Sequence, residues 1–174
     1  MKNHFELLGL APAFALETGR LDRSYREIQS KIHPDRFAHA GDAERRASMQ
    51  WTTQVNEAYR TLKSPVQRAK YLLKLNGVDV AFETNTAMPA DFLMEQMELR
   101  ENLEAARDVD SLDMLQKNLL NQKQTLEAKI AECIDGRHDY SSASDLVRKL
   151  MFLERFGEEI AATHDRIDMQ APEA

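Results

Sequence analysis

Apolar residues recur along most of the chain at the three- to four-residue spacing of an amphipathic helix. No stretch of several residues alternates apolar and polar side chains as a half-buried strand would. The pattern therefore predicts an all-α protein. A short apolar segment covers residues 5–10, long helices are expected at about 18–32, 42–63, 90–107, 111–134 and 142–166, and a shorter helix runs from Pro65 to Gly77.

Small polar residues and prolines mark the expected helix boundaries. Pro34 disfavours helical geometry at the preceding residue, so the first long helix should end at His33. Proline at position 65 suits the first position of the short helix. The candidate N-cap residues are Thr18, Ser64, Ser111 and Ser142.

Residues 77–89 lose the helical period and contain Gly, Asn, Thr and Pro, which is typical of a linker. The sequence thus predicts one domain at 1–76 and a second at 90–174. Short connections within the second domain predict an up-down-up three-helix bundle. The linker also contains Val78, Val80 and Phe82, whose side chains could dock one domain on the other, so we expect a restrained hinge.

The first two long helices are expected to form an antiparallel hairpin, because each has one apolar side. The apolar sides consist of Leu21, Tyr25, Ile28 and Ile32 in the first helix and Trp51, Val55, Ala58, Tyr59 and Leu62 in the second. The opposite side of the first helix is basic and solvated, with Arg20, Arg23, Arg26 and Lys31.

The tripeptide His33-Pro34-Asp35 lies at the expected tip of this hairpin. Proline fixes its own φ and restrains its predecessor, so the histidine and the carboxylate should be held outward with little conformational entropy to lose on binding. A three-residue match recurs by chance, and an exposed helix stop is the simpler interpretation of the tripeptide alone.

The wider context changes that interpretation. The apolar entry segment, the basic helix, the tripeptide and the later "VNEAYRTLKSP" together resemble a J-domain over residues 1 to about 76. This resemblance implies that the hairpin docks on an ATPase chaperone of the DnaK/HscA class, with His33, Pro34 and Asp35 stimulating ATP hydrolysis. It also implies electrostatic docking by Arg23, Arg26 and Lys31, although any one of these could be merely solvated charge.

The rest of the chain lacks the Gly/Phe-rich tract and CxxCxGxG repeats of general J-proteins. It contains instead "SPVQRAKYLLKLNG", "FLMEQMELRENLE" and "DLVRKLMFLERF", and almost the whole chain resembles HscB-type co-chaperones. That resemblance implies delivery of the iron–sulfur scaffold protein IscU to the stimulated chaperone, in support of cluster maturation and transfer. A J-domain co-chaperone that serves a different client is the alternative.

The helix beginning near Ala90 has two apolar stripes, about 100° or more apart. One consists of Phe92, Leu99, Leu103 and Ala106; the other consists of Leu93, Met94 and Met97, with Glu98, Glu101 and Glu104 among or beside them. A second stripe framed by carboxylates is a candidate docking surface, and flexible methionines suit an adaptable one. Alternatively, it packs against the third bundle helix or the linker.

Phe152 is a second candidate for an exposed aromatic residue. It lies roughly 100° from the core-facing line of Leu146, Leu150, Leu153 and Ile160. The HscB resemblance implies that Leu93, Met97 and Phe152 contribute to an apolar scaffold-binding patch. Around that patch it places Met94, Glu98 and Glu101.

Charge is divided unevenly along the chain, whose net value is -6. Residues 1–76 hold 13 Lys and Arg against 8 Asp and Glu, a charge of +5, whereas residues 77–174 hold 10 against 21, a charge of -11. Two halves of opposite sign suggest two functions. The acidic half would repel a polyanion and the arginines lack interleaved aromatics, so we expect no nucleic-acid partner.

Other function classes find little support. There is no Gly-rich phosphate loop, the histidines lack metal-ligand spacing, and Glu98 and Glu101 fit solvated charge on a helix edge. We therefore expect no enzyme, cofactor or metal. No apolar run approaches the ~20 residues that span a bilayer, so no membrane contact is expected. The single cysteine, Cys133, should be a small buried hydrophobe, and a reducing, cytoplasmic location is the simplest fit.

Overall fold

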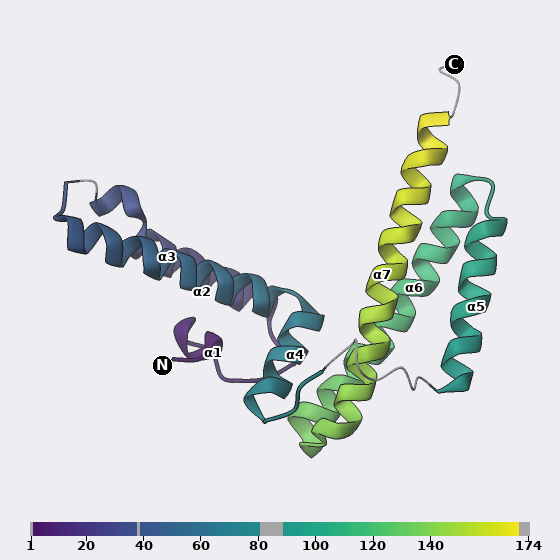
Figure 1. The fold of residues 1–174 in the computed structure, drawn as a ribbon, viewed down its shortest axis with the longest axis horizontal. Helices are drawn as coiled ribbons and strands as arrows, with labels where there is room; N and C mark the ends of the chain where they lie inside the picture. Colours follow the sequence, from purple (N-terminus) through teal and green to yellow (C-terminus); the bar gives the residue numbers. More distant parts are fainter. Residues whose placement is uncertain (1, 38, 81–88, 171–174) are drawn as a thin grey trace.

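The computed structural model describes residues 2–37, 39–80 and 89–170, the side chains only up to residue 167, and every regular element in these ranges is helical. Figure 1 shows a long hairpin on one side of the molecule and a three-helix bundle on the other. The elements are α1 (His4–Leu7), α2 (Thr18–Ile32), the 3-10 helix η1 (Pro34–Phe37), α3 (Asp42–Lys63), α4 (Pro65–Leu75), α5 (Ala90–Ala105), α6 (Val109–Ala131), the π-helical turn η2 (Glu132–Arg137) and α7 (Tyr140–Gln170).

The predicted helices are confirmed, but three of the four predicted N-caps are wrong. Ser64 does cap α4, since its hydroxyl accepts the N–H of Gln67 at 3.3 Å. Glu17 occupies the N-cap of α2, which makes Thr18 its first residue. The other two helices begin earlier than predicted because an aspartate three residues upstream accepts the serine N–H: Asp108 accepts from Ser111 at 2.8 Å and Asp139 from Ser142 at 3.1 Å.

The predicted apolar sides of the α2–α3 hairpin are buried or partly buried, with one exception. Leu21, Val55 and Leu62 are fully buried, whereas Trp51 remains 48% exposed. The hydroxyls of Ser48 and Thr52 donate to the backbone oxygen of Ile32 at 2.6 and 3.4 Å, so polar side chains occupy the face of α3 that meets α2 near the tip. Trp51 is left outside this contact, and its predicted core position is wrong.

One hydrophobic core joins the hairpin to the base of the bundle. It combines the N-terminal Phe5, Leu62 and Leu73 with Ile130 and Leu150 from α6 and α7. Val78 and Val80 also pack on this core, as expected, while Phe82 lies outside the described residues. The proposed boundaries at 1–76, 77–89 and 90–174 stay a prediction.

Polar contacts reinforce the junction between the two parts. The carboxylate of Asp135 accepts the backbone N–H groups of Phe14 and Ala15, both at 2.8 Å. Arg68 is buried beside them, with its guanidinium 5.0 Å from the ring centroid of Phe14 and Nη1 donating to the backbone oxygen of Leu62 at 2.7 Å. Burial lowers the pKa of Arg68. The bonds from Phe14 and Ala15 to Asp135 help to fix how the hairpin meets the bundle.

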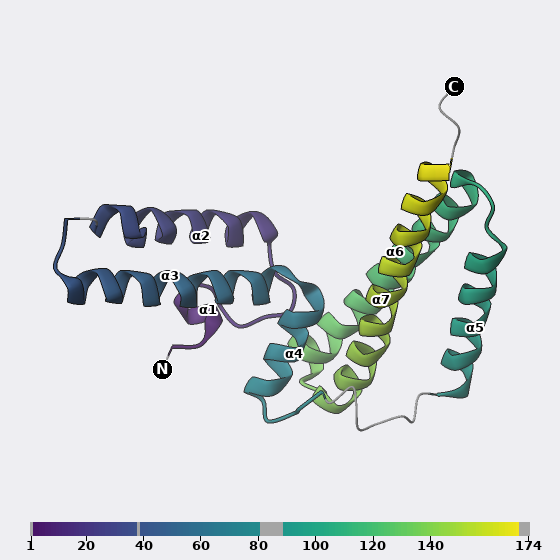
Figure 2. The ribbon, with the colours of Figure 1, turned by 45° about the horizontal axis from the view of Figure 1, so that its top comes forward.

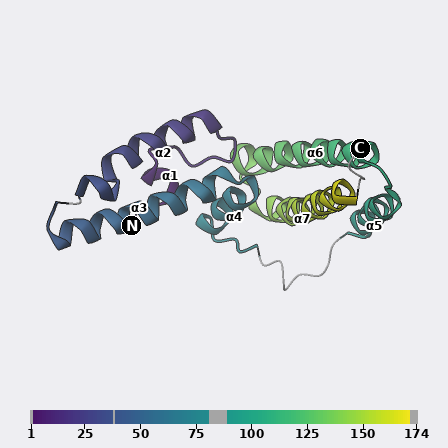
Figure 3. The same ribbon diagram turned by 90° about the horizontal axis from the view of Figure 1, so that it is seen from above.

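The bundle itself has a second core on the side away from the hairpin. It is built from Leu112, Leu119, Leu153, Phe156 and Ile160, to which α5 adds Leu99. Cys133 is 2% exposed, so the prediction of a buried hydrophobe is confirmed. Figures 2 and 3 show α5 on the side of the bundle farthest from the hairpin.

Candidate functional site

The tripeptide His33-Pro34-Asp35 lies at the tip of the hairpin, where α2 ends. The N–H of His33 still donates to the backbone oxygen of Gln29 at 3.0 Å, and Pro34 then begins η1. Arg36 holds this turn against α2, because its Nη1 donates to the backbone oxygen of Ser30 at 2.7 Å. The loop is therefore preorganised by its own hydrogen bonds.

The two polar side chains of the tripeptide are oriented toward solvent. The Asp35 side chain is 90% exposed and that of His33 is 53% exposed. The backbone N–H of Asp35 donates to Nδ1 of His33 at 3.3 Å, so this nitrogen acts as an acceptor. Oδ2 of Asp35 lies 3.4 Å from the same nitrogen, and the 90% exposed carboxylate is open to a partner.

The basic side of α2 is exposed, as predicted. Arg20, Arg23, Arg26 and Lys31 all face solvent. Arg23 makes a long contact of 3.4 Å with Glu17, itself exposed. Such a surface pair contributes little, so the positive charge of this side stays available to a partner.

Sequence reasoning missed the polar group that joins the two hairpin helices. Asp22 on α2 accepts from Lys63 Nζ at 2.6 Å and from the Tyr59 hydroxyl at 3.0 Å. The hydrogen bond from Lys63 is the main cause that lowers the pKa of Asp22. The rings of Tyr25 and Tyr59 stack at 4.1 Å between centroids. Opposite charges at positions 22 and 63 were the available signal, but a separation of 41 residues hides their pairing.

The second apolar stripe of α5 lies in solvent. Leu93, Met94 and Met97 are 49%, 64% and 63% exposed, whereas Phe92 and Leu99 on the other stripe are 4% and 7% exposed. The alternative that this stripe packs against the third bundle helix is therefore wrong, whereas packing against the linker is not tested, because residues 81–88 lie outside the described residues. The carboxylates of Glu98 and Glu101 are exposed beside it.

Phe152 does not form the exposed aromatic residue that was predicted. It is half-buried, and its ring meets that of Phe92 edge to face, with centroids 5.9 Å apart and an interplanar angle of 84°. The guanidinium of Arg100 lies 5.6 Å from its centroid. Phe92 and Arg100 of α5 thus cover Phe152 of α7, which lies beneath the helix that carries Leu93 and Met97.

A buried amide on α5 also escaped sequence reasoning. Gln96 is 5% exposed, and neither its side-chain oxygen nor its nitrogen has a hydrogen-bond partner among the described residues. It interrupts the apolar stripe between Phe92 and Leu99. An unsatisfied buried amide weakens the packing of α5 on the bundle.

In residues 2–37, 39–80 and 89–170 no group of three or more His, Cys, Asp and Glu side chains could hold a metal ion. No helix in the described part of the chain has the length and apolarity needed to cross a bilayer.

A preorganised polar tip on an α2–α3 hairpin is the arrangement of a J-domain, and residues 3–71 match the DnaJ domain family. Residues 88–161 match the family described as the HSCB C-terminal oligomerisation domain. The chain is 48% identical over 169 residues to the "Co-chaperone protein HscB homolog" of Burkholderia vietnamiensis, covering 95% of this chain and 96% of the relative. It is 49% identical over 168 residues to the homologue of Ralstonia nicotianae, with the same coverage.

Solved structures agree with this assignment. Chaperone HscB from Vibrio cholerae has a TM-score of 0.83 at 35% identity, covering 95% of this chain and 99% of that one. Human co-chaperone protein HscB has a TM-score of 0.90 at 26% identity, covering 97% and 84%. The molecule is a J-domain co-chaperone. More particularly, the chain belongs to the HscB family, which confirms the resemblance and the predicted all-α fold.

Proposed function

We propose that this co-chaperone stimulates the ATPase of an HscA/DnaK-class chaperone and delivers an IscU-type iron–sulfur scaffold protein to it, assisting cluster maturation and transfer. One observation carries the proposal: a polar, basic tip and an exposed apolar stripe lie at opposite ends of a molecule with a shared core (Figure 2). Two separate surfaces on one body suit an adaptor between two proteins.

The chaperone-binding surface consists of the tripeptide and the basic side of α2. Arg23, Arg26 and Lys31 attract an acidic surface and raise the rate of encounter. His33, Pro34 and Asp35 then make the specific contact, in which the exposed Asp35 carboxylate accepts hydrogen bonds from the chaperone. Because the loop is already ordered, little conformational entropy is lost when it binds.

The scaffold-binding surface consists of Leu93, Met94, Met97, Glu98, Glu101 and Phe152. The three exposed apolar side chains lose water on binding, and the methionines adapt their shape to the partner. Glu98 and Glu101 border this area and favour basic groups at its edge. Half-buried Phe152 supports the surface from beneath, against Phe92.

The tip is tested with Asp35→Asn in a chaperone ATPase assay, with scaffold binding measured in parallel. The variant keeps the shape of the side chain and removes its charge, so stimulation should be abolished while scaffold affinity is unchanged. Asp79→Asn is the matched control, since Asp79 is exposed but lies away from the tip. Normal stimulation by Asp35→Asn would overturn the assignment.

A J-domain co-chaperone that serves a different client is the second candidate. It shares the tip, so only the α5 surface separates the two functions. Calorimetric titration with an IscU-type scaffold decides between them, because the alternative predicts no binding. We further propose that the protein acts in the cytoplasm, where its one free cysteine would remain reduced.

A further inference from the structure

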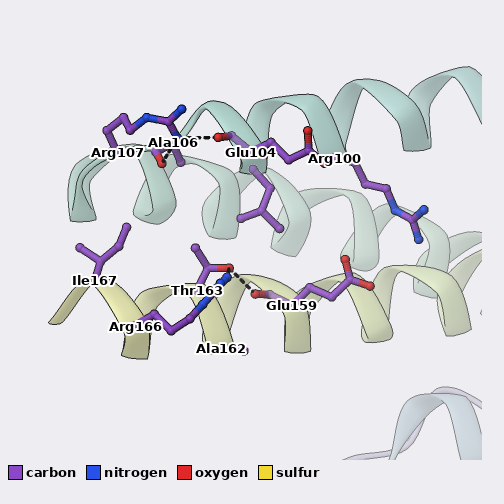
Figure 4. A pocket seen from close by; sticks show the side chains of 10 residues that line it. Arg100, Glu104, Ala106, Arg107, Glu159, Ala162, Thr163, Arg166 and Ile167 are labelled. Atoms are coloured by element: carbon purple, nitrogen blue, oxygen red, sulfur yellow. Dashed lines mark hydrogen bonds between the residues drawn. The ribbon is translucent and has the colours of Figure 1, made fainter. Parts of the chain in front are cut away.

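A groove of about 910 Å³ runs between the C-terminal halves of α5 and α7 (Figure 4). Leu103 on α5, Ala106 at the C-cap of α5 and Ile167 on α7 pack partly against the second core and give the groove an apolar lining. The remaining lining residues are Arg100, Glu104, Arg107, Glu159, Ala162, Thr163 and Arg166.

Two arginines lie at one end of this groove, on opposite walls. Figure 4 shows Arg107 on the α5 side and Arg166 on α7, with Ala106 and Ile167 near them. Arg107 Nη1 donates to the backbone oxygen of Glu104 at 2.6 Å, and Arg166 Nη2 donates to the Thr163 hydroxyl at 2.9 Å. Both guanidinium groups are thus oriented, and in the described part of the chain neither forms an ion pair with a carboxylate.

The charge of the groove is opposite to that of its surroundings. Three arginines face two glutamates, Glu104 and Glu159, along its walls, whereas residues 77–174 as a whole carry 10 basic against 21 acidic side chains. A local basic excess beside apolar side chains suits a ligand that combines a carboxylate with an apolar group. The two glutamates oppose a polyanion such as nucleic acid.

The groove continues the exposed stripe of α5. At 100° per residue, Leu93, Met97, Arg100 and Glu104 fall within about 60° of one another, so the stripe leads along one side of α5 to the groove wall. Arg100 links the two regions, since it lines the groove and lies over Phe152.

We propose that this groove is a second part of the scaffold-binding surface and takes an acidic, amphipathic segment of the scaffold protein. An apolar side chain of that segment packs beside Ala106 and Ile167, and its carboxylate lies between Arg107 and Arg166. Guanidinium groups bind carboxylates through paired, charge-assisted hydrogen bonds. The inference rests on the proposed function and adds a charged specificity site to its apolar patch.

The test is calorimetric titration of the full chain with a purified, cluster-free IscU-type scaffold at low and physiological salt. Arg107→Glu/Arg166→Glu should bind about tenfold more weakly than wild type, equivalent to about 1.4 kcal/mol. Its affinity should also depend less on salt, since an attractive charge pair is lost. Lys117→Glu reverses one charge at an exposed position of α6 outside the groove, so it is the matched control for the single variant Arg166→Glu.

The outcomes separate failure of this inference from failure of the proposed function. If the double variant binds as tightly as Lys117→Glu while Leu93→Ala/Met97→Ala binds weakly, the groove assignment is overturned and the patch stands. If none of the variants affects binding, both fail. Arg107 also donates to the backbone oxygens of Glu104 and Ala106 at the end of α5, so the double variant could lose helicity. In that case the single variant Arg166→Glu is used. It should bind the scaffold more weakly than Lys117→Glu, and equal binding refutes the groove assignment.

Discussion

Truncation of the exposed stripe should separate binding from stability. Leu93 and Met97 are 49% and 63% exposed, so about half of each side chain remains to be buried by a partner. Full burial of such a side chain contributes about 1.5–3 kcal/mol, which gives about 1 kcal/mol for each exposed half. Leu93→Ala/Met97→Ala should therefore lose about 2 kcal/mol of binding free energy, or about 30-fold in Kd.

The same variant should unfold like the wild type. Substitutions of exposed residues change the free energy of unfolding by about 0.5 kcal/mol or less, and alanine is a better helix former than either residue. Two measurements are needed: calorimetric titration with an IscU-type scaffold, and urea denaturation followed by helical circular dichroism. Loss of affinity without loss of stability is the expected pair of results.

The chain offers a closely matched control for this experiment. Leu120 and Met114 are 52% and 69% exposed, and both lie on α6 outside the proposed patch. Leu120→Ala/Met114→Ala removes the same atoms from equally exposed positions. If its Kd agrees within about twofold with that of Leu93→Ala/Met97→Ala, exposed apolar area in general accounts for binding and the reasoning about α5 is refuted.

Two further predictions concern stability. Gln96→Met replaces the unsatisfied buried amide by an apolar side chain of similar size and should raise the free energy of unfolding by about 1–2 kcal/mol in urea titration; an unchanged or lower value would mean that the amide is satisfied. Burial raises the pKa of the Glu154 carboxyl above its ordinary value of 4.5, so the native state disfavours its charged form. Stability is then lost as pH rises from the unfolded pKa through the folded one, and Glu154→Gln should be more stable than wild type at neutral pH. Thermal unfolding at neutral pH and at a pH below 4.5 checks this prediction. Below 4.5 the Glu154 carboxyl is protonated in both the folded and the unfolded state, so the stability advantage of Glu154→Gln must vanish there. An advantage that persists contradicts the assigned pKa shift.

Local patterns predicted the helices and the exposure of most candidate site residues. The tip follows from Pro34, whose effect on His33 needs no distant contact. The two stripes of α5 follow from helical spacing, and their positions 92 and 93 differ in exposure as that spacing requires. Secondary structure and solvent exposure of this kind are set within one helix, so a single sequence contains the information.

Contacts between distant segments were beyond sequence reasoning. Phe152 was predicted to be exposed because its own helix places it off the core line, but α5 covers it through Phe92. Trp51 was predicted to be buried by the same logic. On α3, however, Ser48 contacts α2 near the tip, and no described helix covers Trp51. Periodicity reports which residues share a face and carries no information on which neighbouring helix meets that face.

The junction between hairpin and bundle is the least predictable feature and the one on which an adaptor depends. Asp135 binds Phe14 and Ala15 across 121 and 120 residues of sequence, and no local pattern marks it. Rotation of the hairpin would break these bonds and expose part of the core that joins the hairpin to the base of the bundle, including Val80 and Ile134. Separation of the two parts would therefore cost both these hydrogen bonds and the burial of apolar side chains in the core. Under the proposed function, a chaperone at the tip and a scaffold at α5 are therefore held at a distance set by this junction, and the geometry of transfer is a property of the fold.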